Sequence, residues 1–274
     1  MAIVVTPFRA AVAATLGGAG AVAYLDRPSS HAPLNLARYT ARTPAEAVAL
    51  LERDGVCVVP DAVGAAALRG VLRSEALADA RRASGLRESF VESTAGRWHR
   101  REFGAADGAR LAACEGAWRP VVDAYLGAGL PRSDLQLLVS RAGSDNQFFH
   151  QDNRRRSLTV TLPLVDFTAA LGPTQLLPGS QRLTAPTDAE AGVLDCDVLC
   201  GGALQPAATA VLPAGAALIY DSRVLHRGLA NTTPNVERPM LVYRYDREDA
   251  PAPGHGVLST VGFRLLGKAL SVLQ

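Results

Sequence analysis

Three side chains in this sequence have the types and spacing to hold one metal ion. His150 and Asp152 stand two residues apart, and on a β-strand residues i and i+2 point to the same face. His226 offers a second imidazole much later in the chain, after an apolar stretch. Two imidazoles and one carboxylate on one side of the ion form the facial triad of non-haem Fe(II) oxygenases. The pattern therefore predicts an iron site whose other coordination positions are open.

A His-x-Asp tripeptide alone occurs by chance, but further features accompany this one. Arg238 follows His226 at the end of the run HRGLANTTPNVER, and the turns Gly172–Thr174 and Pro178–Ser180 lie between the two halves of the triad. Together these features resemble the phytanoyl-CoA dioxygenase-like family of Fe(II)/2-oxoglutarate oxygenases. The resemblance covers roughly Ala45 to Asp246 and is most specific in its second half.

The resemblance implies a Fe(II)- and 2-oxoglutarate-dependent dioxygenase that consumes O2 and releases succinate and CO2. Its reaction would be hydroxylation or desaturation of an unactivated C–H bond in a small molecule, with ascorbate a candidate additional requirement. Arg238 matches the family position that anchors the far carboxylate of 2-oxoglutarate, onto which a guanidinium can fork bidentately. Related halogenases have a small residue where this chain has Asp152. The carboxylate therefore argues for hydroxylation or desaturation.

Three further polar residues are candidates for contact with the co-substrate or the metal ligands. Gln147 precedes the first two ligands, Thr174 lies in the Gly-Pro-Thr turn, and Asn231 lies between His226 and Arg238. Each could hydrogen-bond the co-substrate or orient a ligand. Each could equally satisfy the backbone of its own turn, so both interpretations stay open.

Two basic stretches are candidates for substrate contact. Arg154, Arg155 and Arg156 directly follow the predicted ligands, and strand alternation would turn Arg154 inward. An inward arginine would favour a substrate carrying a carboxylate or phosphate. A solvated basic turn is at least an equal alternative, and pairing with the protein's own acids is a further one. His99, in the basic run Gly96–Arg101, is a second candidate. A solvated loop is the favoured interpretation of that run.

Helical patterns predominate in the first part of the chain. Thr43–Glu46 is a capping box with proline in the first turn, and it predicts a helix that stops at Gly55. A longer helical pattern over Ala105–Leu126 is interrupted by Pro120, which can bend or divide it. Residues 84–104 between them are polar and irregular. Two further elements are expected here, a strand over Val56–Val59 and a helix around Leu68–Leu72.

Short strands separated by Gly/Pro turns follow, a pattern that favours a sandwich or barrel. A jelly roll suits the ligand order because its long connections bring distant strands side by side, and the resemblance implies the same double-stranded β-helix. The expected fold is mainly β with flanking helices (α+β), a cupin-like core with the N-terminal helices packed on it. Alternation in Leu158–Leu164 is typical of a half-buried strand. The expected strands are Leu135–Ser140, Phe148–Asp152, Leu158–Leu164, Ala210–Leu212, Ala216–Asp221 and Met240–Tyr245.

The chain divides into two predicted regions. Residues 1–40 are interpreted as a targeting, anchor or disordered segment, and 41–274 as the dioxygenase domain with its barrel core at about 135–246. Residues 10–25 are apolar but short for a membrane span, which leaves weak membrane association open. Two segments are expected to close the domain: an insert over the pocket mouth, Thr184–Pro206, and a final helix, Arg264–Leu273.

Composition limits the partners and the compartment. A formal net charge of +2 does not call for nucleic acid. Four cysteines without a Cys-x-x-Cys pair favour a reducing, intracellular compartment, either the cytoplasm or, given the acid-free N-terminus, a mitochondrion or plastid. The oligomeric state is not indicated.

Two other functions stay open from the sequence. A non-catalytic relative of the same fold could bind metal or ligand as a scaffold or regulator. A cupin-like metalloenzyme could work without 2-oxoglutarate, and it would have no use for Arg238. The presence of both histidines, Asp152 and Arg238 together favours the oxygenase, because a scaffold need not keep all four.

Overall fold

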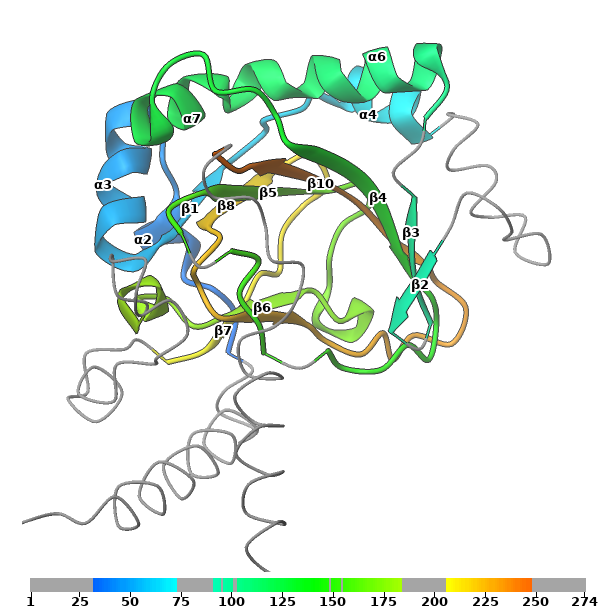
Figure 1. Ribbon diagram of the computed structural model, residues 1–274. Coiled ribbons are helices and arrows are strands. Elements are labelled where there is room, and N and C mark those ends of the chain that lie inside the picture. The colour runs from blue at the N-terminus through cyan, green and yellow to red at the C-terminus, as the bar shows by residue number, and fades with distance from the viewer. Residues whose placement is uncertain are drawn as a thin grey trace, which may run out of the picture.

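Two antiparallel sheets face each other in the computed structural model, with helices covering the outer side of the larger sheet (Figure 1). This is the predicted α+β arrangement of a jelly roll flanked by helices. No helix among the described residues combines the length and the apolar character needed to cross a bilayer. The structure describes residues 32–72, 91–94, 96–100, 103–147, 149–153, 155–183 and 206–247.

The first long helix, α3 (Pro44–Asp54), begins and ends where its sequence signals predict. The Thr43 hydroxyl accepts the backbone N–H of Glu46 at 3.2 Å, and the Glu46 carboxylate accepts the backbone N–H of Arg42 at 2.7 Å. Gly55 ends the helix in the left-handed region at φ 71°. The other helices are α2 (Leu36–Tyr39), α4 (Ala65–Leu72), α6 (Ala105–Ala113) and α7 (Arg119–Leu126), with 3-10 turns η3 (Cys114–Ala117), η4 (Ala169–Leu171) and η5 (Ser180–Leu183).

The helical pattern over 105–126 is divided, as Pro120 predicts. Proline sits in the first turn of α7, where its missing N–H costs nothing, and η3 joins α7 to α6. Trp118 at this junction is fully buried, and its indole N–H donates to the Tyr245 hydroxyl at 2.9 Å. The junction therefore packs the helices onto the large sheet.

The large sheet has seven strands in the order β1-β8-β5-β10-β4-β3-β2, and the small sheet three in the order β7-β6-β9. The large sheet consists of β1 (Val56–Val59), β2 (Val91–Thr94), β3 (Arg97–Arg100), β4 (Asp134–Ser140), β5 (Leu158–Pro163), β8 (Ala217–Asp221) and β10 (Arg238–Tyr245). The small sheet consists of β6 (Thr174–Leu176), β7 (Ala208–Thr209) and β9 (His226–Gly228).

The two faces of the large sheet differ in character. The outer face carries apolar side chains such as Leu137, Leu241 and Tyr243, which belong to the main hydrophobic core. The inner face is mixed: it carries the polar Ser140 and Arg238 together with a small apolar cluster of Leu138, Met240 and Val242. Strand β5 is buried along its whole length. The prediction that it is half-buried was wrong, because helices cover one face and the small sheet the other.

Three sequence predictions of local structure differ from the structure. Residues 84–104 were expected to be irregular, but β2 and β3 lie within them, and β3 pairs with β4. Phe148–Asp152 is not a strand among its described residues; it makes a single bridge, His150 to His226. The strand expected at Ala210–Leu212 is β7, two residues earlier. The N-terminal apolar stretch, the insert and the closing helix lie outside the described residues.

The folded domain begins earlier than the predicted boundary at residue 41. Leu34 and Tyr39 are both only 4% exposed and belong to the main core. The backbone of Leu34 donates to Thr209 at 2.8 Å, and Thr40 forms a bridge to Val58 in β1. Residues 32–40 therefore pack against the barrel. The sequence hides this because the segment is too short for a periodic pattern.

The early start of the domain predicts unequal effects of two similar leucine substitutions. Leu34→Ala should lower the free energy of unfolding by about 2–3 kcal/mol, because it opens a cavity in the core. Leu36→Ala is the matched control, since Leu36 is 37% exposed, and should change it by less than about 0.5 kcal/mol. Urea denaturation would compare the two. Equal effects would show that the segment does not belong to the core.

Candidate metal centre

The three predicted metal ligands come together at the junction of the two sheets. The Nε2 atoms of His150 and His226 lie 3.8 and 3.6 Å from Oδ1 of Asp152. One ligand atom from each residue falls within 4.8 Å of the other two. Reciprocal backbone hydrogen bonds of 2.9 Å join His150 to His226 and fix this approach. One ion placed between them could therefore contact all three groups.

His226 presents its Nε2 atom to the centre. Its Nδ1 lies 3.0 Å from the Val224 carbonyl oxygen, which can only accept, so Nδ1 carries the proton. Burial lowers the pKa of His226 to about 4, even though the neighbouring carboxylate of Asp152 opposes that shift. The ring is therefore neutral near pH 7, and its Nε2 lone pair can coordinate a cation.

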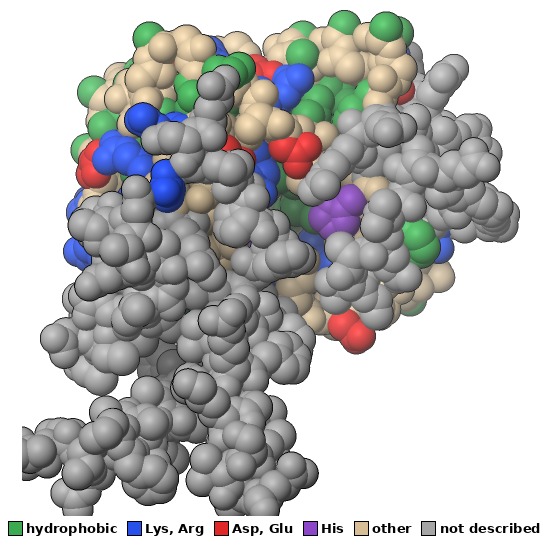
Figure 2. Space-filling view, viewed as in Figure 1, with side chains coloured by type: hydrophobic (Ala, Val, Ile, Leu, Met, Phe, Trp, Pro, Cys, Tyr) green, Lys and Arg blue, Asp and Glu red, His purple; other side chains and the backbone are tan. Residues whose placement is uncertain are grey.

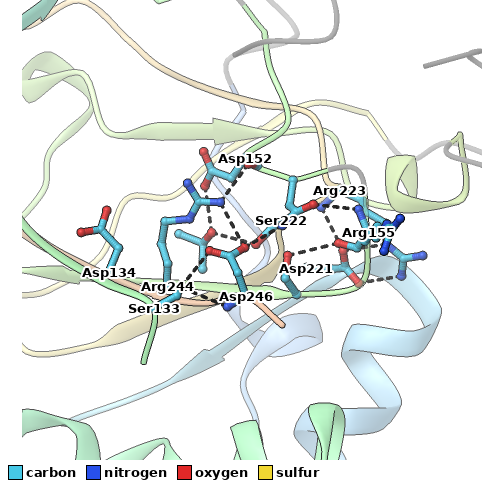
Figure 3. A network of polar contacts seen from close by, with 12 residues as sticks. Ser133, Asp134, Asp152, Arg155, Asp221, Ser222, Arg223, Arg244 and Asp246 are labelled. Carbon is cyan, nitrogen blue, oxygen red and sulfur yellow. Dashed lines mark hydrogen bonds and ion pairs between the residues drawn. The ribbon is translucent and has the colours of Figure 1, made fainter. Parts of the chain in front are cut away.

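Asp152 is held as an oriented carboxylate. Its Oδ2 accepts the Thr159 hydroxyl at 2.8 Å and the Tyr220 hydroxyl at 3.4 Å. Burial alone would raise the pKa of Asp152, but His226, Arg244 and His150 together lower it to about 2. Arg244 also donates to the Asp152 backbone oxygen at 2.8 Å (Figure 3). The Thr159 and Tyr220 hydroxyls therefore occupy Oδ2 of Asp152, and Oδ1 is left facing the two imidazoles.

A buried ion pair fixes the loop that delivers His226. Arg223 donates to the carboxylate of Asp221 through two nitrogens, at 2.9 and 2.7 Å (Figure 3). The Tyr125 hydroxyl donates to the same carboxylate at 2.7 Å. Ser222 lies between Asp221 and Arg223 in the chain. Its backbone carbonyl accepts the backbone N–H of Asp152 at 2.9 Å. The loop therefore connects α7 to both halves of the triad. Sequence reasoning missed this role.

A second charged pocket lies beside the triad. Arg238 and Arg97 are both 0% exposed, and each donates to the hydroxyl of Ser140 at 2.7 Å. Burial, and after it the neighbouring Arg97, holds the pKa of Arg238 well below its ordinary value. Burial also lowers the pKa of Arg97 to about 10, against the opposing effect of Asp145.

Among the residues that the structure describes, several donors of this arginine pair have no partner. Arg238 leaves its Nε and Nη1 atoms without a hydrogen bond there, and Arg97 leaves its Nε. Arg97 is otherwise anchored by the carbonyl oxygens of Asp145, at 2.8 Å, and Leu229, at 2.5 Å. Buried cationic donors without partners are costly. The pocket is therefore suited to an anion that would complete their hydrogen bonds.

A glycine stands where Arg97 and Gln147 come close to strand β9. Gly228 lies two residues after His226 on this strand, about 7 Å along it. A Cβ atom at Gly228 would come within 2.7 Å of Nη1 of Arg97 and 2.8 Å of Oε1 of Gln147. Any larger residue would therefore clash with these two side chains, so the glycine permits Arg97 to lie near the triad.

The other predicted contacts near the co-substrate fall into two groups. The Gln147 side chain accepts the backbone N–H of Gly228 at 2.9 Å, which places it at the pocket edge. Thr174 pairs with Gly228 across the small sheet, on the face that carries His226, and is buried. Asn231 uses its amide on the carbonyls of Ser140, at 3.2 Å, and Val236, at 2.7 Å. Asn231 therefore supports the backbone beneath the pocket.

The two basic stretches that were candidates for substrate contact lie in different environments. Arg156 donates to the Glu52 carboxylate and lies 3.8 Å over the ring of Tyr125, so it pairs with the protein itself. Arg154 lies outside the described residues. The run around His99 was interpreted as a solvated loop, which was wrong: it is strand β3, and Arg97 in it is fully buried. No sequence signal distinguished Arg97 from its basic neighbours.

Comparison with known proteins gives a family match and several structures of similar fold. The family model described as phytanoyl-CoA dioxygenase (PhyH) matches residues 51–240. Among solved structures, the epimerase SnoN, in complex with Fe3+, alpha ketoglutarate and nogalamycin RO, is 22% identical with a TM-score of 0.61, covering 76% of this chain and 85% of that one. The carbocyclase SnoK is 17% identical with a TM-score of 0.61, covering 83% and 93%. EctD from S. alaskensis, with 2-oxoglutarate and 5-hydroxyectoine, is 17% identical with a TM-score of 0.59, covering 81% and 84%.

The lowered pKa of His226 predicts acid sensitivity of the metal-free protein. In the unfolded chain His226 has its ordinary pKa of 6.5 and binds a proton below that pH. In the folded protein its pKa is about 4, so it stays neutral until the pH falls to about 4. Stability should therefore fall as pH falls through that window, by on the order of 2–3 kcal/mol. Chelator-treated protein would be unfolded in urea at several pH values, with His226→Gln as the comparison. Parallel pH profiles for the two proteins would contradict the assignment.

Proposed function

The chain belongs to the phytanoyl-CoA dioxygenase family, and we propose that it is a Fe(II)- and 2-oxoglutarate-dependent dioxygenase acting on a small organic molecule. The observation that carries the proposal is the pair of buried arginines beside the His-Asp-His site. A triad alone would suit many metalloenzymes. A triad next to buried guanidinium donors without partners calls for a co-substrate that has both a metal-chelating end and an anionic end.

The residues of the centre fit iron. We assign the metal to His150, Asp152 and His226, because two neutral imidazoles and one ionised carboxylate suit Fe(II) and leave open positions. The groups behind them support this set. Val224 fixes the protonated nitrogen of His226, and Thr159 turns the second carboxylate oxygen of Asp152 away from the centre.

The arginine pocket fits the far carboxylate of 2-oxoglutarate. We assign Arg238 as its anchor and Arg97 as a second cation, with Ser140 placed between them. The Nε and Nη1 atoms of Arg238 leave its guanidinium with buried donors for the carboxylate. Gln147 and Thr174 form the neighbouring wall. In this arrangement the keto-acid end would reach the metal past Gly228.

The chain's own residues orient the reactants and exclude water. Bound Fe(II) and 2-oxoglutarate would supply O2 activation and the removal of a hydrogen atom from an unactivated C–H bond. The buried arginine pair fixes the far end of the co-substrate, which sets the direction of its reactive end. Tyr220 packs against His226, with ring centroids 4.7 Å apart, and shields the ligand from solvent. The protein thus contributes geometry and electrostatics.

The proposed reaction type is hydroxylation or desaturation. Asp152 fills the coordination position that a halogenase of this family would leave for a halide. The similar structures include an epimerase and a carbocyclase, so the outcome after C–H activation depends on how the substrate lies. A scaffold or regulatory role has less support, because unpartnered buried arginines are costly unless a ligand uses them.

Loss of one imidazole should abolish turnover without unfolding the protein. His226→Ala is expected to reduce Fe(II)-dependent succinate release from 2-oxoglutarate by at least about a hundredfold, since the ion would lose one of three ligands. Succinate would be quantified by mass spectrometry, and circular dichroism would check the fold. Succinate release at the wild-type rate from this variant would rule out His226 as a ligand.

The two buried arginines should each govern affinity for 2-oxoglutarate. Arg238→Ala and Arg97→Ala are expected to weaken its binding by about 2–5 kcal/mol, because a buried carboxylate loses a charged partner. The matched control is Arg53→Ala, which removes an arginine that is half exposed on α3. Calorimetric titration of 2-oxoglutarate would measure all three. Wild-type affinity in Arg238→Ala would refute the anchor, and wild-type affinity in Arg97→Ala would leave Arg238 as the anchor and remove Arg97 from the pocket.

A further inference from the structure

The described part of the segment that carries His150 and Asp152 forms no strand, so pairing in a sheet does not place both ligands. It makes a single bridge, between His150 and His226. This bridge fixes the backbone at His150, but Asp152 lies two residues beyond it. A functional side chain has to be held to within about 0.5 Å of its working position. Other contacts must therefore place Asp152.

The loop after β8 holds the backbone of this segment at one point. The Ser222 carbonyl accepts the backbone N–H of Asp152 at 2.9 Å and that of Asn153 at 3.1 Å. Both hydrogen bonds end on one oxygen atom, so they define a point about which the segment can still turn. A second attachment to the backbone is needed to fix the direction of Asp152.

The end of strand β10 supplies this second attachment through three side chains, here called the Asp246 clamp: Asn153, Arg244 and Asp246. Arg244 donates through Nη2 to the Asp152 carbonyl at 2.8 Å and to Oδ1 of Asp246 at 3.2 Å. Asn153 donates through Nδ2 to the same Oδ1 at 2.8 Å. Figure 3 shows Arg244 between Asp152 and Asp246. The clamp therefore ties Asp152 and the residue after it to one carboxylate.

The hydrogen bonds of Asn153 have a fixed direction. Its Oδ1 accepts the backbone N–H of Arg155 at 3.0 Å, which leaves the amide nitrogen toward Asp246. Asn153 is 2% exposed, and Arg244 and Asp246 are each 8% exposed. Apolar side chains of similar size in place of a buried ion pair are often equally favourable for stability. They could not, however, set the direction of the Asp152 carbonyl.

The other oxygen of Asp246 is attached to the sheet and not to the metal-ligand segment. The Ser133 hydroxyl donates to Oδ2 of Asp246 at 2.8 Å and accepts the backbone N–H of Asp246 at 3.1 Å. The backbone N–H of Ser133 donates to the Arg244 carbonyl at 2.8 Å, which continues the pairing of β4 with β10. The contacts of this carboxylate with the sheet and with the ligand segment can therefore be removed separately.

From these contacts we propose that the Asp246 clamp positions Asp152 for the metal ion. The inference rests on the proposed function, since it takes Asp152 as a ligand. The clamp stops the backbone of Asp152 from turning about the Ser222 carbonyl, so Oδ1 stays directed toward the two imidazoles. The three members of the clamp act through the backbone and are positioning residues, not ligands. Loss of supporting contacts of this kind typically weakens metal binding by about 10–100-fold.

The Mn(II) affinity of the full chain tests the proposal without turnover. An added ion can reach the site, since the His150 side chain is 25% exposed and histidine side chains are visible at the surface (Figure 2, purple). The EPR signal of the free ion would give the Kd. Asn153→Ala should raise the Kd about tenfold or more, because the ligand segment loses its donor to Asp246. Arg244→Lys should raise it at least about threefold, because the positive charge stays while the geometry of the guanidinium is lost.

Two variants control for a general loss of stability. Ser133→Ala removes the hydroxyl contact with the other oxygen of Asp246, and Leu34→Ala opens a cavity in the main core. Both should keep the Kd for Mn(II) within about twofold of the wild-type value, because neither touches the ligand segment. Urea denaturation of the metal-free proteins would show that each variant is folded.

The outcomes separate the clamp from the metal site itself. If the wild-type protein binds no Mn(II), the assignment of the metal ligands fails, and the proposed function fails with it. If the wild-type protein binds Mn(II) but either Asn153→Ala or Arg244→Lys binds it equally well, the clamp does not position Asp152 and the inference fails alone. The same holds if Ser133→Ala or Leu34→Ala weakens binding as much as Asn153→Ala does.

Discussion

Two guanidinium groups buried around one hydroxyl are the constraint on which the rest of the site depends. Arg97 and Arg238 both donate to Ser140, and three of their nitrogens have no hydrogen-bond partner in the described part of the chain. Such an arrangement is unfavourable unless an anion completes it. Strand β3 contributes to this arrangement, because its pairing with β4 places Arg97 opposite Ser140. The fold thus keeps a cationic pocket ready for a ligand.

The candidate metal centre is assembled by a different principle, in which Asp152 and His226 are each oriented by a neighbour. Val224 sets the tautomer of His226, and Thr159 holds one oxygen of Asp152. The Asp221–Arg223 ion pair holds the loop between β8 and β9. Because Thr159 and Asp221 lie on the large sheet and the two histidines meet at β9 of the small sheet, the site forms where the two sheets come together.

The sequence predicted those parts of the protein whose signals are local. The capping box at Thr43 and the left-handed Gly55 bound α3 as expected, and Pro120 divides the later helices. The triad was recognisable from its residue types and from the two-residue spacing of His150 and Asp152, although this segment makes only an isolated bridge and not the expected strand. Arg97 was missed, since its burial depends on pairing with β4 rather than on its neighbours in sequence. The packing of Leu34 was missed for the same reason: only the tertiary contact reveals it.

The most direct test of this account compares two keto acids that differ at the far end. 2-Oxoglutarate and pyruvate share the metal-chelating group, but only 2-oxoglutarate has the second carboxylate that Arg238 and Arg97 are proposed to bind. Each would be titrated without oxygen into the Fe(II)-loaded protein while the visible charge-transfer band is followed. The account predicts a band for both, with pyruvate requiring at least about thirtyfold more. Equal concentrations for the two acids would contradict it.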